Sequence, residues 1–436
     1  MKKKMNQQLI SLALAGALTL MPVIGVNADT KVEVEEDSKS LPLQQLRIFA
    51  QIFGRIKQDY VEPVEDSELL ENAIKGMLSG LDPHSSYLDA DDFKDLREGT
   101  SGEFGGLGIE IGTEDGFIKV ISPIDDTPAE RAGIKAGDLI TRIDDKPVKG
   151  MSLDDSVKLM RGKPGTSIEL TIMRKTQHEP LKITIVRDVI KVNSVKGRLI
   201  DERFAYLRIS QFQSKTTEDL LKKIEKLKKE SKAKISGYII DLRNNPGGVL
   251  QAAVSVSDTF LTEGLIVYTK GVTDDSKMEF SAEPEDIADG APIVVLVNEG
   301  SASASEIVAG ALQDHKRAVI IGQQTFGKGS VQTIVPITDS IAIKLTTARY
   351  YTPSGRSIQA EGITPDIELK ELEIAGVKDK STERIKEADL VGHLENAKVK
   401  KSEKDSDDEK SLAETDYALH EAVNLLKGLT LIGGRK

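Results

Sequence analysis

Between about residues 192 and 350, short apolar runs alternate with amphipathic stretches, and this order constrains the fold more than any other feature of the chain. The apolar runs have the length and composition of buried strands, and the stretches between them space their apolar residues as helices do. Strands that alternate with helices form a largely parallel sheet covered by helices, so we expect an α/β fold here. The strand-like runs are YIIDLR, LIVYTK, PIVVLVNE and AVIIG, and the helix-like stretches are TTEDLLKKIEKLKK, VLQAAVSVSDTFL and SEIVAGALQDHK.

The remainder of the 436-residue chain divides by the same patterns. Residues 29–98 favour helices, with apolar residues at i, i+3 and i+4 on both sides of Pro63. Residues 99–188 open with a glycine-dense run and predict short alternating strands with two short helices. We assign residues 189–376 to the α/β core. Residues 377–436 begin with a charged stretch typical of a linker and end in a predicted helix, ETDYALHEAVNLLKGL.

The N-terminus has the pattern of an export signal. Lys2, Lys3 and Lys4 precede the apolar run of residues 9–26, and small residues around Ala28 offer a cleavage point. The run is nearly long enough to span a bilayer, but Pro22 and Gly25 interrupt it, which favours a cleaved signal peptide at 1–28 over a retained anchor. We expect an otherwise soluble, exported protein.

Charge and composition exclude several classes of site. A net charge of −11 argues against nucleic acid as a partner. The chain has no cysteine, which excludes disulfides, a thiol nucleophile, thiolate metal ligands and a lipid-modified cysteine. The lysine-rich stretch 220–234 is typical of a solvated helix face, because its apolar residues recur at helical spacing. Those residues are Leu220, Leu221, Ile224 and Leu227.

The stretch GSASASE, residues 300–306, places three serines on alternate positions after an apolar strand. Ser303 and Glu306 match the capping box, in which the two side chains satisfy the first amides of a helix. A helix N-terminus also gathers outward-pointing N–H groups and partial positive charge, so a nucleophile there would have oxyanion donors beside it. Spacing alone does not choose among the three serines.

Histidine is the usual base for a serine nucleophile, but no histidine here fits. His315 lies at the far end of the helix that Ser303 would begin, roughly 18 Å away at ~1.5 Å per residue. The other four lie in other predicted segments without a triad context; they are His84, His178, His393 and His420. The run Ser231 to Lys234 spells S-x-x-K but lacks companion motifs, so we treat it as chance.

A lysine is the better candidate base. Gly322 to Lys328 resembles most of a phosphate-binding P-loop, but Gly329 stands where a magnesium-binding Ser or Thr is needed, and the residues after it favour a strand. We therefore expect no nucleotide. Within a strand, Lys328, Ser330 and Gln332 would share one face.

Only a neutral amine can accept the serine proton, and burial favours the neutral form. A glutamine neighbour can orient the lysine without restoring its charge, whereas a carboxylate neighbour would undo the shift. An exposed loop lysine is the alternative that spacing leaves open.

The motifs GSASASEIVAGALQD and TFGKGSVQ, with DLRNNPGG at 241–248 and LDPHSSYL at 81–88, resemble the carboxyl-terminal processing (tail-specific) proteases. The resemblance covers about residues 42–372 and implies a crotonase-like parallel-sheet protease core with an inserted PDZ domain and helical ends. It further implies Ser303 as nucleophile, Lys328 as general base and Gln332 as the residue that positions the lysine. The implied oxyanion donors are the N–H groups of Gly248 and Ala304.

The region at 99–188 resembles a PDZ domain, in which backbone amides of a glycine-rich loop capture a chain terminus and the next strand pairs with the peptide. Its loop would be Gly106, Leu107, Gly108 and Ile109, and the run PAERAGIKAGDLITRIDDKPV also suits that domain.

The family resemblance implies protein substrates with accessible C-termini and an energy-independent reaction that needs no cofactor, metal or nucleotide. It also implies gating by the PDZ domain, a periplasmic location, envelope substrates that include cell-wall hydrolases, and an adaptor lipoprotein. The helical ends, 42–97 and 416–436, are apolar on one face, which suits either a homo-oligomer or packing on their own core. The rival interpretation is a PDZ scaffold with an inert core. A lost serine or lysine would signal that rival, and both are present.

Overall fold

The computed structural model describes residues 41–124, 126–177, 179–370 and 412–433. The expected signal peptide and most of the expected charged linker lie outside these ranges. The chain forms two compact units, residues 1–70 and 71–436, which are described separately.

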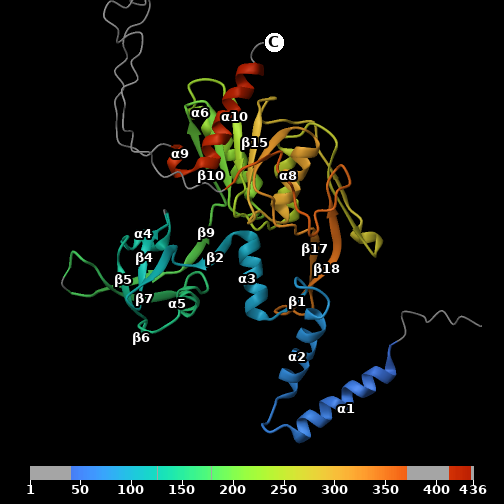
Figure 1. Ribbon diagram of the computed structural model, residues 1–436. Coiled ribbons are helices and arrows are strands. Elements are labelled where there is room, and N and C mark those ends of the chain that lie inside the picture. Colours follow the sequence, from blue (N-terminus) through green and yellow to red (C-terminus); the bar gives the residue numbers. More distant parts are fainter. Residues whose placement is uncertain (1–40, 125, 178, 371–411, 434–436) are drawn as a thin grey trace, which may run out of the picture. The chain divides into compact units, whose positions relative to one another are not determined.

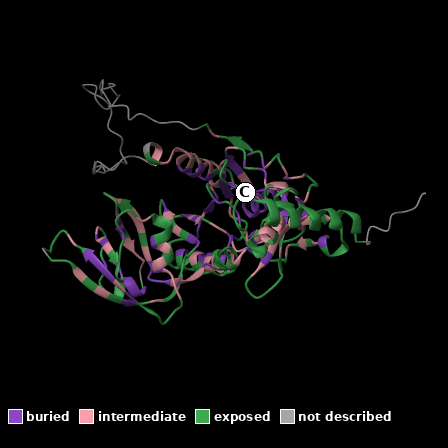
Figure 2. Ribbon diagram, turned by 90° about the horizontal axis from the view of Figure 1, so that it is seen from below, coloured by how far each residue is buried: buried purple, intermediate pink, exposed green. Residues whose placement is uncertain are grey.

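The first unit contains helix α1 (Leu43–Asp59), and α2 (Asp66–Ser79) begins at its end. Both helices lie where the apolar spacing predicts them, with Pro63 between them. Helix α1 buries none of its residues, and Figure 2 shows it coloured almost entirely as exposed. Its apolar side chains are therefore unpartnered within this unit.

A six-stranded sheet forms the centre of the second unit, with the strand order β10-β11-β12-β15-β16-β19 (Figure 1). Only the β10–β11 pair is antiparallel, which confirms the largely parallel sheet predicted from the sequence. The strands are β10 (Val195–Ile200), β11 (Phe204–Ile209), β12 (Gly237–Asp241), β15 (Ile293–Val297), β16 (Ala318–Gly322) and β19 (Ile367–Glu368).

Helices cover both faces of this sheet, because alternate strand residues point to opposite sides. Val295 belongs to a core shared with helices α6, α7 and α8, whereas its neighbours Val294 and Leu296 pack with α10. Figure 1 shows α8 and α10 beside the sheet. The helices are α6 (Thr216–Glu230), α7 (Leu250–Asp258), α8 (Ala304–Asp314), α9 (Leu412–Thr415) and α10 (Tyr417–Gly433).

The sequence prediction was wrong for one strand of the core. The run LIVYTK forms a strand, β13, but β13 belongs to a second, antiparallel sheet, since its neighbours are β14 and β18. The lysine-rich stretch forms an amphipathic helix, α6, as predicted: Leu220, Ile224 and Leu227 are buried, and Leu221 is 36% exposed. The second sheet consists of β1 (Ser86–Leu88), β13 (Leu265–Gly271), β14 (Glu279–Ser281), β17 (Ser330–Pro336) and β18 (Ala342–Tyr351).

Residues 103–191 form a smaller body with its own apolar core. Its main sheet has the order β3-β4-β5-β7-β8, so β3 is an edge strand, and β2 pairs with β9. Helix α3 (Ala90–Ser101) leads into β2. The elements are β2 (Glu103–Gly106), β3 (Ile109–Glu114), β4 (Phe117–Pro123), α4 (Pro128–Arg131), β5 (Leu139–Ile143), β6 (Lys146–Pro147), α5 (Leu153–Met160), β7 (Ser167–Met173), β8 (Leu181–Val186) and β9 (Asp188–Lys191).

Within the described ranges, no helix combines the length and the apolar character needed to cross a bilayer.

Candidate active site

Ser303 lies where strand β15 turns into helix α8. It is the N-cap of α8, and its backbone has φ +56° and ψ −111°, a conformation that residues with a side chain rarely adopt. Such strain persists only where the surroundings enforce it, and it gathers at functional sites. Ser303 is 7% exposed, so its hydroxyl is reached only from the cleft that it lines.

Glu306 fixes this turn. Its carboxylate accepts the Ser303 N–H at 2.6 Å, which confirms the predicted capping box. The same carboxylate also accepts three donors from the loop before β17: the Thr325 hydroxyl at 2.6 Å, the Gly327 N–H at 2.7 Å and the Lys328 N–H at 2.9 Å. Burial raises the pKa of Glu306, and these hydrogen bonds oppose the increase. Glu306 therefore joins the segment of the serine to the segment of the lysine.

The sequence identified Glu306 only as a helix cap. Its second role depends on the loop at 325–328, which meets α8 only in the folded chain. A local motif carries no signal for that contact.

Lys328 lines the same cleft of about 710 Å³ as Ser303, Gln332 and Gly248. Burial lowers the pKa of Lys328, and the nearby charge of Lys344 lowers it further, while Glu306 opposes both. A carboxylate is thus close to the lysine, but it does not undo the downward shift of the lysine pKa, contrary to what the sequence predicts for a carboxylate neighbour. The Lys328 ammonium nevertheless forms no ion pair within the described residues, because Glu306 directs its oxygens to backbone and hydroxyl donors.

Gln332 lies on β17, after Lys328, at a point where the strand register shifts. Its amide nitrogen donates to the Ser330 hydroxyl at 2.8 Å and to the Thr346 hydroxyl at 3.4 Å. The predicted strand face of Lys328, Ser330 and Gln332 is therefore only partly present, because Lys328 lies before β17 whereas Ser330 and Gln332 are hydrogen-bonded to each other. Among the described residues, the structure has no side-chain hydrogen bond from Lys328 to either Ser303 or Gln332. The three side chains share one cleft but are not linked.

The loop after β12 forms another part of the cleft wall. Gly247 and Gly248 have φ +100° and +139°, which favours glycine. A Cβ added to Gly247 would lie 2.9 Å from the Ser303 Cβ and 3.0 Å from the Ala304 nitrogen, so this backbone is pressed against the start of α8. Within the described chain, the N–H groups of Gly248 and Ala304 donate no backbone hydrogen bond. Two free donors thus lie beside the serine.

Comparison with known proteins identifies the family. A carboxy-terminal-processing protease of Bartonella bacilliformis is 50% identical over 88% of this chain and 89% of its own length. The carboxy-terminal processing protease CtpA of Bacillus subtilis is 36% identical over 83% of this chain and 76% of its own. This chain belongs to the carboxy-terminal-processing proteases. That finding confirms the resemblance drawn from the motifs.

Three family models match parts of this processing protease. They are peptidase family S41 at residues 203–369, the PDZ domain at 105–185 and the activating protease CtpB N-terminal domain at 12–92. Among solved structures, the photosystem II D1 C-terminal processing protease is 31% identical, with a TM-score of 0.44 over 76% of this chain and 94% of that one.

The histidines of the processing protease lie as follows. His315 is the C-cap of α8, and its Nε2 lies 2.7 Å from the Leu265 carbonyl oxygen, away from the serine. His420 belongs to α10, whereas His178 and His393 lie outside the described residues. His84 is closer to the site than the sequence suggested, since burial and the charge of Lys328 both lower its pKa. Its segment reaches the cleft because Ser86 pairs with Lys344 of β18.

The predicted carboxylate loop of the PDZ domain joins β2 to β3. Leu107 is buried, and its carbonyl accepts the Ala129 N–H at 2.9 Å. Gly108 has φ +79° and lies against Thr127, whose hydroxyl donates to the Gly108 carbonyl at 3.1 Å. Ile109 then begins the edge strand β3, where an added peptide strand has unpaired backbone groups to bind.

Proposed function

We propose that this chain is an exported serine endopeptidase that binds substrate C-termini with its PDZ domain and cleaves by a serine–lysine dyad on a crotonase-like core. Ser303 is the nucleophile, Lys328 the general base and Gln332 the residue that positions the lysine. The observation that carries the proposal is the shared cleft, in which a half-buried lysine, without an ion-pair partner among the residues that the structure describes, lies with a strained, buried serine.

The chemistry requires one proton transfer in each direction. The Ser303 Oγ attacks the peptide carbonyl carbon while its proton passes to the neutral Lys328 amine. The carbonyl oxygen becomes an oxyanion that accepts hydrogen bonds from the Gly248 and Ala304 N–H groups. The C–N bond then breaks, and the leaving amine takes the proton from Lys328. Water hydrolyses the acyl-enzyme by the same route, with Lys328 again acting as the base.

Gating by the PDZ domain accounts for the missing contact between serine and lysine. Helix α3 lines the cleft with Asp95, Leu96, Gly99 and Thr100, and its end leads directly into β2 of the PDZ body. A peptide added at β3 would therefore act on a body joined to the wall of the cleft. Binding of a substrate terminus would draw Lys328 and Ser303 into hydrogen-bonding distance.

The proposed location and partners are based on the family of the chain, on the export-signal pattern of residues 1–28 and on the exposed helix α1. We propose that residues 1–28 direct export to the periplasm, where the enzyme acts on envelope proteins, including cell-wall hydrolases, with an adaptor lipoprotein. We also propose that copies of the chain associate through α1, because this helix exposes a row of large apolar residues. These are Leu43, Leu46, Phe49, Ile52 and Ile56.

Degradation of a loosely folded protein such as casein tests the function. The wild-type chain should degrade casein without ATP, and Ser303→Ala should not. An equal rate for both would assign the activity to a contaminant. A wild-type chain that binds C-terminal peptides but cleaves nothing would favour the PDZ scaffold instead.

A further inference from the structure

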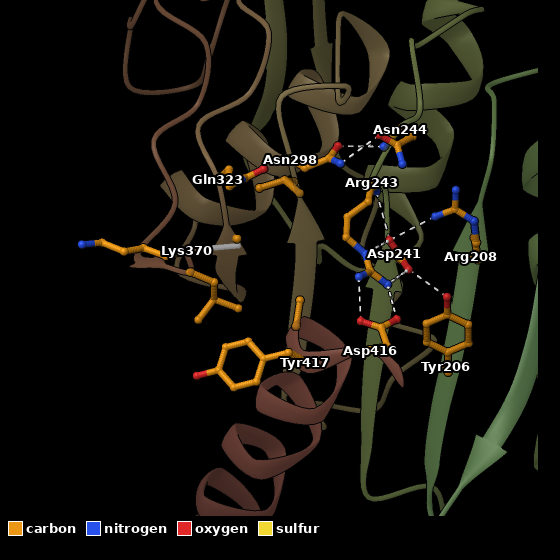
Figure 3. Close-up of a pocket in the computed structure, with 14 residues that line it drawn as sticks. Tyr206, Arg208, Asp241, Arg243, Asn244, Asn298, Gln323, Lys370, Asp416 and Tyr417 are labelled. Atoms are coloured by element: carbon orange, nitrogen blue, oxygen red, sulfur yellow. Dashed lines mark hydrogen bonds and ion pairs between the residues drawn. The ribbon is translucent and has the colours of Figure 1, made fainter. Parts of the chain in front are cut away.

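A second cavity, of about 810 Å³, lies where β12, β15 and β16 end and α10 begins (Figure 3). It contains none of the proposed catalytic residues, yet it is lined by buried and half-buried charges. It shares the loop after β12 with the active-site cleft, since the start of this loop lines the cavity and its end lines the cleft. The residues that matter here are Arg208, Asp241, Arg243, Asn244, Asn298 and Asp416.

Asp241, the last residue of β12, holds the guanidinium of Arg243 from one side. Its carboxylate is fully buried and accepts the Arg243 Nε at 3.0 Å and Nη2 at 2.6 Å. It also accepts the Arg243 backbone N–H at 3.0 Å and the Tyr206 hydroxyl at 2.8 Å, and the Arg208 Nη1 lies 3.2 Å away. The side chain and the backbone of Arg243 are thus bound to one anchor.

Asp416 holds the same guanidinium from the other side, at the junction between α9 and α10. Nη1 and Nη2 of Arg243 each donate to one Asp416 oxygen at 2.8 Å, the two-pronged geometry that only arginine offers (Figure 3). Oδ1 of Asp416 also accepts the Leu419 N–H at 3.0 Å, so the first turn of α10 orients the carboxylate. Burial works against both charges, but the mutual hydrogen bonds raise the pKa of Arg243 and lower that of Asp416.

The loop that begins at Arg243 reaches the serine within a few residues. The Asn244 N–H donates to the Asn298 Oδ1 at 2.8 Å. Asn245 accepts the Gly247 N–H on its side-chain oxygen at 2.9 Å, and its carbonyl accepts the Ser305 hydroxyl at 2.9 Å. Asn244, Asn245 and Gly247 are therefore each held by a hydrogen bond, and the segment that joins Arg243 to Gly248 is only four residues long.

We propose that Asp416 is a positioning residue for catalysis: it fixes Arg243, and through Arg243 the backbone that presents the Gly248 N–H to the oxyanion. The C-terminal helix is then part of the active-site architecture, although it contributes no atom to the cleft. This inference rests on the proposed function, because it assigns a support to the proposed oxyanion donor.

If Asp416 served only to dock α10, its loss would displace the helix, and any effect on Ser303 would follow from that displacement. Helix α10 buries Leu419, Ala422, Val423 and Leu426 against the sheet, each at most 3% exposed. This apolar face is sufficient to dock the helix, so loss of the Asp416 charge should leave α10 in place. The effect on Ser303 and the effect on docking can therefore be measured separately.

The test uses the full-length chain with Asp416→Asn. The rate at which a biotinylated fluorophosphonate phosphonylates Ser303, with loss of fluoride, should fall at least about tenfold, since small misplacements of an oxyanion donor are costly. The kcat for a fluorogenic peptide with a free C-terminus should fall equally, and its KM should stay within about twofold because binding is untouched. Asp416→Glu, which keeps the carboxylate, should recover part of the rate.

Lys427→Met is the matched control, because Lys427 also ties α10 to the core, through Asp201 at 2.7 Å, but does not contact Arg243. It should react with the fluorophosphonate at the wild-type rate. A wild-type rate in Asp416→Asn, or equal losses in both variants, would overturn the inference. If Asp416→Asn loses its fold by circular dichroism, Arg243→Lys replaces it with the same expectations, since a lysine cannot bind both carboxylates in this way. A wild-type chain that neither reacts with the probe nor cleaves the peptide would instead contradict the proposed function itself.

Discussion

Two half-buried cations near the loop after β12, Arg243 and Lys328, have pKa values that are shifted in opposite directions. On one side, Arg243 is surrounded by acceptors from Asp241 and Asp416, so its pKa is raised and its charge is permanent. On the other, burial and the charge of Lys344 lower the pKa of Lys328, and its amine has no hydrogen-bond acceptor among the described residues to offset that shift. The difference teaches that, for two half-buried cations, the hydrogen-bonded partners decide whether the pKa rises or falls.

The largest effect should come from making the base permanently charged. Lys328→Arg keeps a cation in the cleft but cannot lose its proton at accessible pH. We expect peptide cleavage to fall about 10³-fold or more, close to the level of Ser303→Ala, because general-base catalysis is lost. Steady-state kcat measures this, with the exposed Lys226→Arg of α6 as the control. Cleavage retained in Lys328→Arg would show that the lysine acts as a charge and not as a base.

Removing each of the two cations should change the free energy of unfolding in opposite directions. Arg243→Met leaves Asp241 and Asp416 without their shared cation and should destabilise the fold by about 2–4 kcal/mol. Lys328→Met removes a half-buried amine that has no ion-pair partner in the described part of the chain, and should stabilise the fold by about 0.5–2 kcal/mol. Urea denaturation of both variants at neutral pH measures the pair. The account is contradicted if both variants destabilise the protein to a similar extent.

The smallest effect should be a shift of the pH–activity profile when the charge of Lys344 is removed. The groups near Lys328 are Lys344 on β18, Glu306 on α8, His84 in the segment before β1 and Asp95 on α3. Lys344→Met removes a positive charge that lowers the pKa of Lys328, so this pKa should rise. In the proposed mechanism the amine of Lys328 must be neutral. The acidic limb of the pH–activity profile should therefore move to higher pH, by up to about one unit. Lys270→Met on β13 should not move it, and an unchanged limb in Lys344→Met would exclude Lys344 from tuning the base.

The sequence predicted those parts of the molecule that depend on local pattern. The alternation of YIIDLR, PIVVLVNE and AVIIG with amphipathic stretches was sufficient for the parallel sheet, because strand and helix periods are properties of a short window. The capping box of Ser303 and Glu306, and the strand after Lys328, were recognisable for the same reason.

Other features depend on contacts between distant segments and were not predictable in this way. LIVYTK reads as one more parallel strand, but its partner β18 lies about 80 residues later and draws it into a second sheet. The links from Glu306 to the loop of Lys328 and from Arg243 to Asp416 likewise join segments that only the fold brings together. The strain at Ser303 has no sequence signature, since serine at an N-cap ordinarily adopts an extended backbone.

The pH dependence of Ser303 phosphonylation by a fluorophosphonate tests the central claim most directly, because it reports the protonation of the base without the later steps of turnover. Labelling of the wild-type chain, with peptide bound to the PDZ domain, should rise with pH along a single titration whose midpoint lies below the ordinary lysine value of 10.5. The same titration should be absent in Lys328→Arg. A midpoint at the ordinary lysine value, or the same titration in Lys328→Arg, would contradict the assignment of Lys328 as the neutral base.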